Sequence, residues 1–345
     1  MPAGASGARP FLFRKDSTRM RLVEIDDLQV SFSQHEGLVQ AVRGVSFDLE
    51  SGESLGIVGE SGSGKSVTCS ALLRLLREPP ARITARTMKL GGLDMLGASR
   101  REISAVRGRV AAMVFQDPMT SLDPVFTVGH QIIETITTHK KISKAEARKE
   151  AAAALRRVEI KNADAVLKYY PHQLSGGMLQ RVMIAMALSC EPAVLIADEP
   201  TTALDVTIQA QILQLIKDIQ TETGMGLIMI THDLGVIAET VDRVVVLYGG
   251  KVMETGPVND IFKNPLHPYT KALLNSIPGQ VAGKRRLTEI PGASPNPAHP
   301  PAGCPFHPRC PAAIAACHQL TPPLETKVPG RQAACIRVAP ELVAA

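Results

Sequence analysis

The chain has 345 residues, 45% of them hydrophobic, which is enough to bury one large α/β core and still leave a further segment. Its formal net charge of +5 is small for this length and the basic residues are scattered, so the composition does not favour nucleic-acid binding. No stretch reaches the roughly 18 uninterrupted apolar residues of a membrane helix. The first twenty residues lack the apolar core of a secretory signal.

In chain order, residues 1–20 are rich in glycine, alanine and arginine, and we expect them to be disordered. Short apolar strands are expected next, at residues 22–25, 28–32, 45–49 and 54–58. Helical periodicity follows at residues 66–76, 125–168, 175–189 and 206–223, and further strands are expected at 110–115, 193–197, 227–230 and 243–247. Strands that alternate with helices predict a mostly parallel sheet covered on both faces.

Residues 59–66, with the sequence GESGSGKS, fit the phosphate-binding pattern G-x-x-x-x-G-K-[ST] between an expected strand and an expected helix. Glycines let backbone amides curl around phosphate oxygens, and the helix directs its positive end at the same anion. We expect Lys65 to hold the β- and γ-phosphates and Ser66 to ligate Mg²⁺. The residues expected to line the nucleotide here are Gly59, Glu60, Ser61, Gly62, Ser63, Gly64, Lys65, Ser66 and Val67.

Polar side chains follow three of the expected strands. The apolar run 194–197 ends in Asp198 and Glu199, which would emerge at the carboxyl edge of the sheet beside the phosphate loop. Asp198 suits the Mg²⁺ shell, and Glu199 suits a general base that polarises the attacking water. Gln116 can contact both Mg²⁺ and water, and His232 can hydrogen-bond the γ-phosphate and steady the base. Taken singly, a Gln or a His at a strand end is more often structural, but their order favours a hydrolytic site.

The order of these motifs, with LSGGMLQR at residues 174–181 and Ala203-Leu204-Asp205 later in the chain, resembles that of ABC-type ATPases over residues 22–260. The resemblance implies that Ser175, Gly176 and Gly177 bind the γ-phosphate of ATP held by a second cassette. A hydroxyl and glycine amides at a helix N-terminus are a suitable anion site. The resemblance also implies that Asp205 bridges the two cassettes and that Phe32 stacks on adenine, although Phe32 could instead be a core aromatic.

The fold that this resemblance implies is an α/β P-loop ABC ATPase cassette at residues 21–270. It would have a mostly parallel core sheet, an N-terminal antiparallel β subdomain and a helical subdomain at about residues 117–180. A C-terminal extension rich in cysteine and proline would follow at residues 271–345, where the composition changes.

Four further segments narrow the family: FQDPMTSLDP, YPHQ, HPYT and GCPFHPRCP, which begin at residues 115, 170, 267 and 303. Together they look like the ATP-binding subunits of bacterial dipeptide and oligopeptide importers, and are closer to the dipeptide "D" type. The resemblance implies a peripheral ATPase on the cytoplasmic face of the inner membrane. Its partners would be a second ATPase subunit as heterodimer, two permeases that provide its only membrane contact, and an extracytoplasmic peptide-binding protein, with no nucleic acid.

Two other functions stay open. The same group of importers includes transporters for nickel and other small solutes, so the cargo is not fixed by these motifs. A DNA-repair or chromosome-type ABC ATPase is more distant, because such proteins carry a long coiled coil between the phosphate loop and the LSGG segment. The interval here is too short and lacks sustained heptads.

Four of the six cysteines lie within the last 42 residues: Cys304, Cys310, Cys317 and Cys335. In a cytosolic protein such a group predicts metal binding rather than disulfides. The spacing matches neither the common ferredoxin runs nor the paired cysteines of zinc ribbons, so Zn²⁺, an iron–sulfur cluster and free thiols all stay open. Three nearby histidines keep zinc in consideration: His299, His307 and His318. The resemblance to peptide-importer ATPases favours a [4Fe–4S] cluster.

Overall fold

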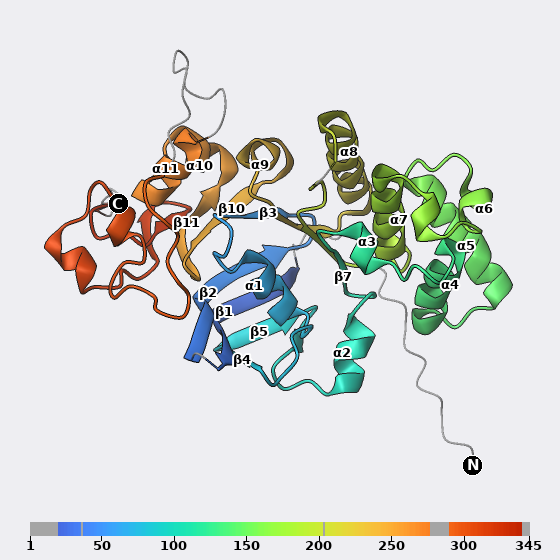
Figure 1. Ribbon diagram of the computed structural model, residues 1–345, viewed down its shortest axis with the longest axis horizontal. Coiled ribbons are helices and arrows are strands. Elements are labelled where there is room, and N and C mark those ends of the chain that lie inside the picture. The colour runs from blue at the N-terminus through green and yellow to red at the C-terminus, as the bar shows by residue number, and fades with distance from the viewer. Residues whose placement is uncertain (1–19, 36, 203, 277–289, 340–345) are drawn as a thin grey trace.

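The computed structural model describes residues 20–35, 37–202, 204–276 and 290–339 (Figure 1). The disorder expected for residues 1–20 therefore falls almost entirely outside the described residues, as does Ala203. Within the described ranges, two sheets organise the molecule: a five-stranded antiparallel sheet and an eight-stranded, mostly parallel sheet. None of the described helices is long and apolar enough to cross a membrane.

The antiparallel sheet is built around one long strand. Its strands are β1 (Arg21–Gln34), β2 (Gly37–Glu50), β4 (Ala81–Thr84), β5 (Thr87–Leu90) and β6 (Leu93–Asp94). We expected two separate strands within β1, but the strand is continuous. Asp27 has a φ of 52°, and the pairing with β2 shifts register between Ile25 and Leu28. The polar residues in the middle of β1 therefore form a bulge rather than a turn.

The larger sheet has the order β12-β13-β11-β10-β3-β9-β8-β7. Its parallel strands are β3 (Ser54–Val58), β7 (Ala111–Val114), β8 (Val194–Asp198), β9 (Gly226–Ile230) and β10 (Arg243–Tyr248), with β11 (Lys251–Pro257) antiparallel to β10. Every residue of β3, β8 and β9 is buried. Leu195 belongs to one hydrophobic core and Ile196 to another, because successive side chains of a strand point to opposite faces. The sheet is thus covered on both faces, as expected.

The helices lie around both sheets of the molecule. They are α1 (Lys65–Leu72), α2 (Arg100–Val106), α3 (Pro118–Ser121), α4 (Val128–His139), α5 (Lys144–Arg157), α6 (Ala163–Val166), α7 (Gly176–Leu188), α8 (Val206–Thr223), α9 (Leu234–Thr240), α10 (Val258–Lys263) and α11 (Pro268–Asn275). Helices α4, α5, α6 and α7 form a group at one end of the molecule in Figure 1. Helix α1 ends earlier than its apolar pattern predicts, because Arg74 adopts a φ of 55° directly after the Leu73 cap.

The C-terminal segment is joined to the larger sheet. Strands β12 (Glu325–Val328) and β13 (Arg331–Ala333) extend this sheet beyond β11, after the short 3-10 turns η2 (His307–Arg309) and η3 (Ala315–His318). Arg331 donates to the buried Glu254 carboxylate of β11 at 2.9 Å, and this carboxylate also accepts from the backbone amides of Leu266 and His267. Because a buried charge without its partner is costly, these contacts fix the segment against β11.

Burial of His267, which precedes α11, predicts an acid-sensitive contribution to stability. Its side chain is 1% exposed and its Nδ1 accepts from the Tyr269 backbone amide at 3.0 Å. Burial lowers the pKa of His267 from 6.5 to about 3, although a hydrogen bond to Ala334 opposes the shift. The folded-state pKa is depressed, so this stabilisation is complete above pH 6.5 and is lost as the pH falls towards 3.

We therefore expect His267→Gln to reduce the loss of unfolding free energy between pH 7 and pH 4, measured by urea denaturation at each pH. The exposed His299 provides the matched control, since His299→Gln removes an imidazole without changing a buried site. Equal pH slopes for the wild type and His267→Gln would show that the buried imidazole makes no such contribution.

Candidate active site

The loop at residues 59–64 is shaped by close backbone contacts. It connects β3 to α1 and has positive φ angles at Gly59 (150°) and Gly64 (99°). A Cβ at Gly59 would lie 2.1 Å from the Leu247 carbonyl oxygen, and one at Gly64 would lie 2.5 Å from that of Ala41. Neither position accepts a side chain, so this curled loop at the start of α1 requires glycine. This is the arrangement that a phosphate-binding loop needs.

Lys65 lies across the curled loop. Its side-chain nitrogen donates to the carbonyl oxygens of Gly59 at 2.8 Å and Glu60 at 3.1 Å, and the residue is 7% exposed. Burial lowers the pKa of Lys65, and the negative charges of Glu199, Asp198 and Glu60 oppose that shift. The Ser63 hydroxyl is buried and makes no hydrogen bond within the described part of the chain. A cation and an unpaired hydroxyl donor in one loop suit an anionic phosphate.

Ser66 and Asp198 meet at the start of α1. The Ser66 hydroxyl donates to Asp198 Oδ1 at 2.8 Å across 132 positions of the chain. Burial raises the pKa of Asp198, the charge of Glu199 adds to this effect, and Ser66 and Lys65 oppose it. Hydroxyl and carboxylate oxygens are the ligands that Mg²⁺ prefers, and a bound cation would favour the ionised carboxylate. The two residues therefore fit a magnesium site.

Glu199 is the centre of a hydrogen-bond network at the carboxyl ends of the strands. Gln116 and Thr202 donate to its Oε2, each at 2.9 Å, and His232 Nδ1 lies 3.1 Å from its Oε1. Glu199 has a φ of 47°, which is uncommon for a side chain of this size, and its backbone amide donates to Ile230 at 2.8 Å. Sequence reasoning missed Thr202, because only the observed turn brings it to this carboxylate.

The Glu199 carboxylate stays ionised in this network. Burial alone raises its pKa, but hydrogen bonds from His232 and Thr202 and the electrostatic effects of His232 and Lys65 outweigh burial and lower it. The neighbouring Asp198 shifts in the opposite direction. An ionised carboxylate beside an imidazole and an amide can accept a proton from a bound water.

The residues predicted to contact a second cassette lie at the N-termini of two helices. Ser175 caps α7, where its hydroxyl accepts from the Met178 amide at 3.4 Å, and Asp205 caps α8 by accepting from the Ile208 amide at 3.0 Å. Ser175, Gly176 and Asp205 are exposed, and Gly177 is half-buried. None of the hydrogen bonds within the described ranges joins residues 175–177 to residues 59–66. The LSGG helix end is therefore open to a ligand or partner from outside the chain.

Phe32 lies on β1, outside the network around Glu199. Its ring is half-buried and packs against the hydrophobic core that the antiparallel sheet shares with β3 and α1. The residue pairs with Val39 of β2 and Ala81 of β4. This position leaves part of the ring free, so both stacking on a base and a role in the core fit it.

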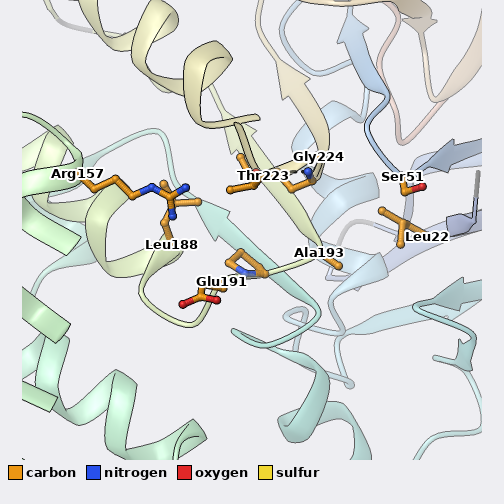
Figure 2. Close-up of a pocket in the computed structure, with 10 residues that line it drawn as sticks. Leu22, Ser51, Arg157, Leu188, Glu191, Ala193, Thr223 and Gly224 are labelled. Carbon is orange, nitrogen blue, oxygen red and sulfur yellow. Dashed lines mark hydrogen bonds between the residues drawn. The ribbon is translucent and has the colours of Figure 1, made fainter. Parts of the chain in front are cut away.

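A pocket of about 300 Å³ lies at the opposite ends of the parallel strands (Figure 2). Ala193 immediately precedes β8 and Met225 immediately precedes β9, whereas the network above follows the carboxyl ends of these strands. Its lining also includes Leu22, Arg157 and Glu191, and none of the predicted site residues lines it. The pocket is therefore separate from the nucleotide chemistry.

Two family descriptions match the chain. Residues 42–202 match "ABC transporter", and residues 253–317 match "Oligopeptide/dipeptide transporter, C-terminal region". The chain is 51% identical to the probable peptide ABC transporter ATP-binding protein y4tR of Sinorhizobium fredii, over 92% of this chain and 95% of that protein. It is 51% identical to the dipeptide transport ATP-binding protein DppD of Bacillus subtilis, over 88% of this chain and 90% of the relative.

Solved structures agree with these matches. One similar structure is the dimeric post-hydrolysis state of the ATP-binding cassette MJ0796 bound to ADP and Pi. The two chains are 28% identical and superpose with a TM-score of 0.62, and the match covers 69% of this chain and 99% of the MJ0796 chain. The fold and the phosphate loop thus define a P-loop ATPase that uses ATP and Mg²⁺. The chain belongs to the ABC transporter family, in the group that carries the oligopeptide/dipeptide transporter C-terminal region. The cassette fold and the family expected from the sequence are confirmed.

We expect Glu199→Gln to lower ATP turnover by roughly 10²–10⁴-fold, the usual contribution of a general base. The amide keeps the size of the side chain but cannot take the proton from water, so the variant should also accumulate ATP-bound dimers. Steady-state turnover and size-exclusion chromatography with ATP measure the two effects. Glu191→Gln is the matched control, because Glu191 also has a positive φ (52°) but lies outside the network. Near-normal turnover of Glu199→Gln would remove Glu199 from this role.

Proposed function

We propose that this chain is the ATP-hydrolysing subunit that energises import of dipeptides or oligopeptides across the bacterial inner membrane. The observation that carries this proposal is the joint presence of the family's two regions with about 50% identity to peptide-transport ATPases over most of the chain. The oligopeptide transport ATP-binding protein OppD of Salmonella typhimurium, for example, is 48% identical over 93% of this chain and 95% of its own length. The hydrolytic network around Glu199 supports an active enzyme.

In the proposed mechanism, the loop amides and Lys65 hold the phosphates and offset their charge. Ser66, Gln116 and Asp198 would hold Mg²⁺, which supplies Lewis-acid stabilisation of charge on the phosphoryl group. Glu199 orients the attacking water and accepts its proton, and His232 keeps the carboxylate in place. The contacts of Asp198 with Ser66 and of Glu199 with Gln116 and His232 support these roles.

A second cassette would complete the site. Ser175, Gly176 and Gly177 would contact the γ-phosphate held by the partner cassette, and Asp205 would lie at the contact between the two. The exposure of the α7 and α8 N-termini supports this arrangement, as does the dimeric state of the related cassette bound to ADP and Pi. A helix N-terminus with free amides stabilises an anion presented to it. We propose that the partner is a second ATPase subunit, which gives a heterodimer.

Permease subunits would dock beside the Gln116 strand end. Exposed apolar side chains accumulate there: Phe115, Met119, Val125, Phe126, Tyr169 and Tyr170. Backbone contacts join this region, because the Val128 amide donates to the Tyr169 carbonyl at 2.9 Å. A mostly apolar groove of about 210 Å³ adjoins it, lined in part by Phe115 and Met186. Exposed apolar surface of this kind marks an interaction site. In this proposal two permeases occupy it and hold the chain peripherally at the cytoplasmic face of the membrane.

For the C-terminal cysteines we propose a [4Fe–4S] cluster, with Zn²⁺ as the alternative. All four thiols are free, and three of them are buried. Burial raises the pKa of Cys304 to about 11, and the neighbouring Cys317, Cys335 and Cys310 add to this shift. The Cys304 backbone amide donates to the Cys317 carbonyl at 3.0 Å. Within the described ranges, however, no three metal-binding side chains have an arrangement that could hold an ion. Binding would thus require the thiols to move closer and lose their protons.

Anaerobic purification tests this cysteine assignment. We expect coloured protein with stoichiometric iron and acid-labile sulfide, and loss of both in Cys304→Ser. Cys190→Ser is the matched control, because Cys190 is a buried cysteine far along the chain from the cluster. Colourless protein without iron would contradict the iron–sulfur assignment, and stoichiometric zinc in its place would favour the alternative.

The transport function is tested by reconstituting the chain with its permeases and second ATPase in lipid vesicles. We expect a peptide-loaded binding protein to stimulate ATP hydrolysis and peptide to accumulate in the importing direction. A binding protein without peptide is the control and should stimulate much less. Stimulation only by nickel or another small solute would replace the proposed cargo, and stimulation by DNA would contradict import altogether.

A further inference from the structure

Glu60, the second residue of the phosphate loop, is held by residues from the C-terminal third of the chain. Arg309 Nη1 donates to Glu60 Oε2 at 2.7 Å, across 249 positions of sequence. The Ser294 hydroxyl contacts the same carboxylate oxygen, and the Glu60 backbone amide donates to the Tyr269 hydroxyl at 2.9 Å. Both the side chain and the backbone of Glu60 therefore depend on partners outside the loop.

The guanidinium of Arg309 is oriented by contacts other than the one with Glu60. Its Nη1 also donates to the Tyr248 hydroxyl at 3.1 Å, and the group lies 5.7 Å from the centre of the Tyr248 ring. Nη2 and Nε donate to the carbonyl oxygens of Ile290 and Pro291 at 3.0 and 2.9 Å. The side chain is 7% exposed. A planar group fixed in this way presents a preoriented cation to the loop.

The position of Arg309 is set by the packing of the C-terminal segment. The residue ends η2, between Cys304 and Cys310, and its backbone amide donates to the Phe306 carbonyl at 3.0 Å. Phe306 is fully buried, with its ring centre 5.3 Å from that of Tyr248 and 5.2 Å from that of Tyr269. These two tyrosines are the same residues that contact Arg309 and the Glu60 amide. The aromatic cluster thus connects the segment to the loop directly.

We propose that Arg309 is a positioning residue for the phosphate loop, through which the C-terminal segment sets the affinity of the cassette for ATP. Holding Glu60 keeps the first turn of the loop curled before nucleotide arrives, which reduces the ordering cost of binding. Lys65 donates to the Glu60 carbonyl, so the contact between Arg309 and Glu60 also helps to position the Lys65 ammonium group that binds phosphate. This inference rests on the proposed assignment of residues 59–66 as the ATP loop.

The test uses Arg309→Met and Glu60→Gln in the full chain. We expect either change to weaken MgATP binding roughly tenfold in calorimetry, because small displacements of positioned groups cost affinity of this order. In the assembled transporter KM should rise by the same factor while kcat changes less than about twofold, the pattern of lost uniform binding. The double variant should bind MgATP no more weakly than either single variant, because both substitutions remove the same interaction between Arg309 and Glu60. Arg309→Lys, which keeps the charge, should recover part of the affinity.

Arg243→Met is the matched control. Arg243 donates to Glu53 at 2.8 Å and to the Asp48 carbonyl at 2.6 Å, so it is another arginine that joins separate elements. Within the described ranges its hydrogen bonds do not reach the phosphate loop. It should lower the melting temperature and leave ATP affinity unchanged. If Arg309→Met and Glu60→Gln also lower only the melting temperature, Arg309 has a merely structural role and the proposal is wrong. If Arg309→Met does not fold, Glu60→Gln decides alone.

Lys65→Ala separates failure of this proposal from failure of the ATP loop assignment. Loss of ATP binding in Lys65→Ala with normal binding in Glu60→Gln overturns the positioning role only. Unchanged ATP binding in Lys65→Ala would overturn the loop assignment and, with it, the positioning role. Loss of ATP binding in Lys65→Ala together with weakened binding in Glu60→Gln supports both the loop assignment and the positioning role.

Discussion

Complete burial of the central parallel strands is the constraint on which the site depends. Every residue of β3, β8 and β9 is buried, so charged groups emerge only where these strands end. The three strands are neighbours in the order β3-β9-β8, and their carboxyl ends meet at one edge. Lys65, Glu199 and His232 are brought together there from positions far apart in the sequence. The glycines of the loop then let backbone amides approach the same edge.

Burial acts differently on the two adjacent carboxylates, and this difference separates their chemistry. Desolvation dominates at Asp198 and raises its pKa, whereas hydrogen bonds from His232 and Thr202 keep the pKa of Glu199 low. Asp198, a buried carboxylate beside the Ser66 hydroxyl, suits the binding of a cation. Glu199, an ionised carboxylate held by three hydrogen bonds, suits the acceptance of a proton. The C-terminal segment adds a third influence, because it reaches the loop at Glu60 through Arg309.

The sequence predicted the parts of the structure that depend on local pattern. Strands β3, β8, β9 and β10 were predicted to within about one residue, because each is a short apolar run with turn residues at its ends. The sequence also predicted that His232 would steady the Glu199 carboxylate, and His232 Nδ1 lies 3.1 Å from Glu199 Oε1. For Gln116 it predicted contact with Mg²⁺ and water, and the hydrogen bond from Gln116 to Glu199 was not foreseen. It did not predict β12 and β13, because these short polar strands depend on long-range pairing: β13 pairs with β11, and β12 pairs with β13. The contact between Arg309 and Glu60 was also beyond prediction, because an isolated arginine has no pattern that reveals a partner 249 positions away.

The central claim is that ATP is enclosed between two cassettes, with the phosphate loop of one facing the α7 N-terminus of the other. Cryo-electron microscopy of the complete transporter, with ATP trapped in the Glu199→Gln variant, tests it most directly. Our account predicts ATP density in contact with Lys65 of this chain and with the glycine-rich helix start of the partner cassette, with Ser175 of this chain facing the second nucleotide. Nucleotide enclosed within a single cassette, with residues 175–177 of both cassettes exposed to solvent, would contradict it.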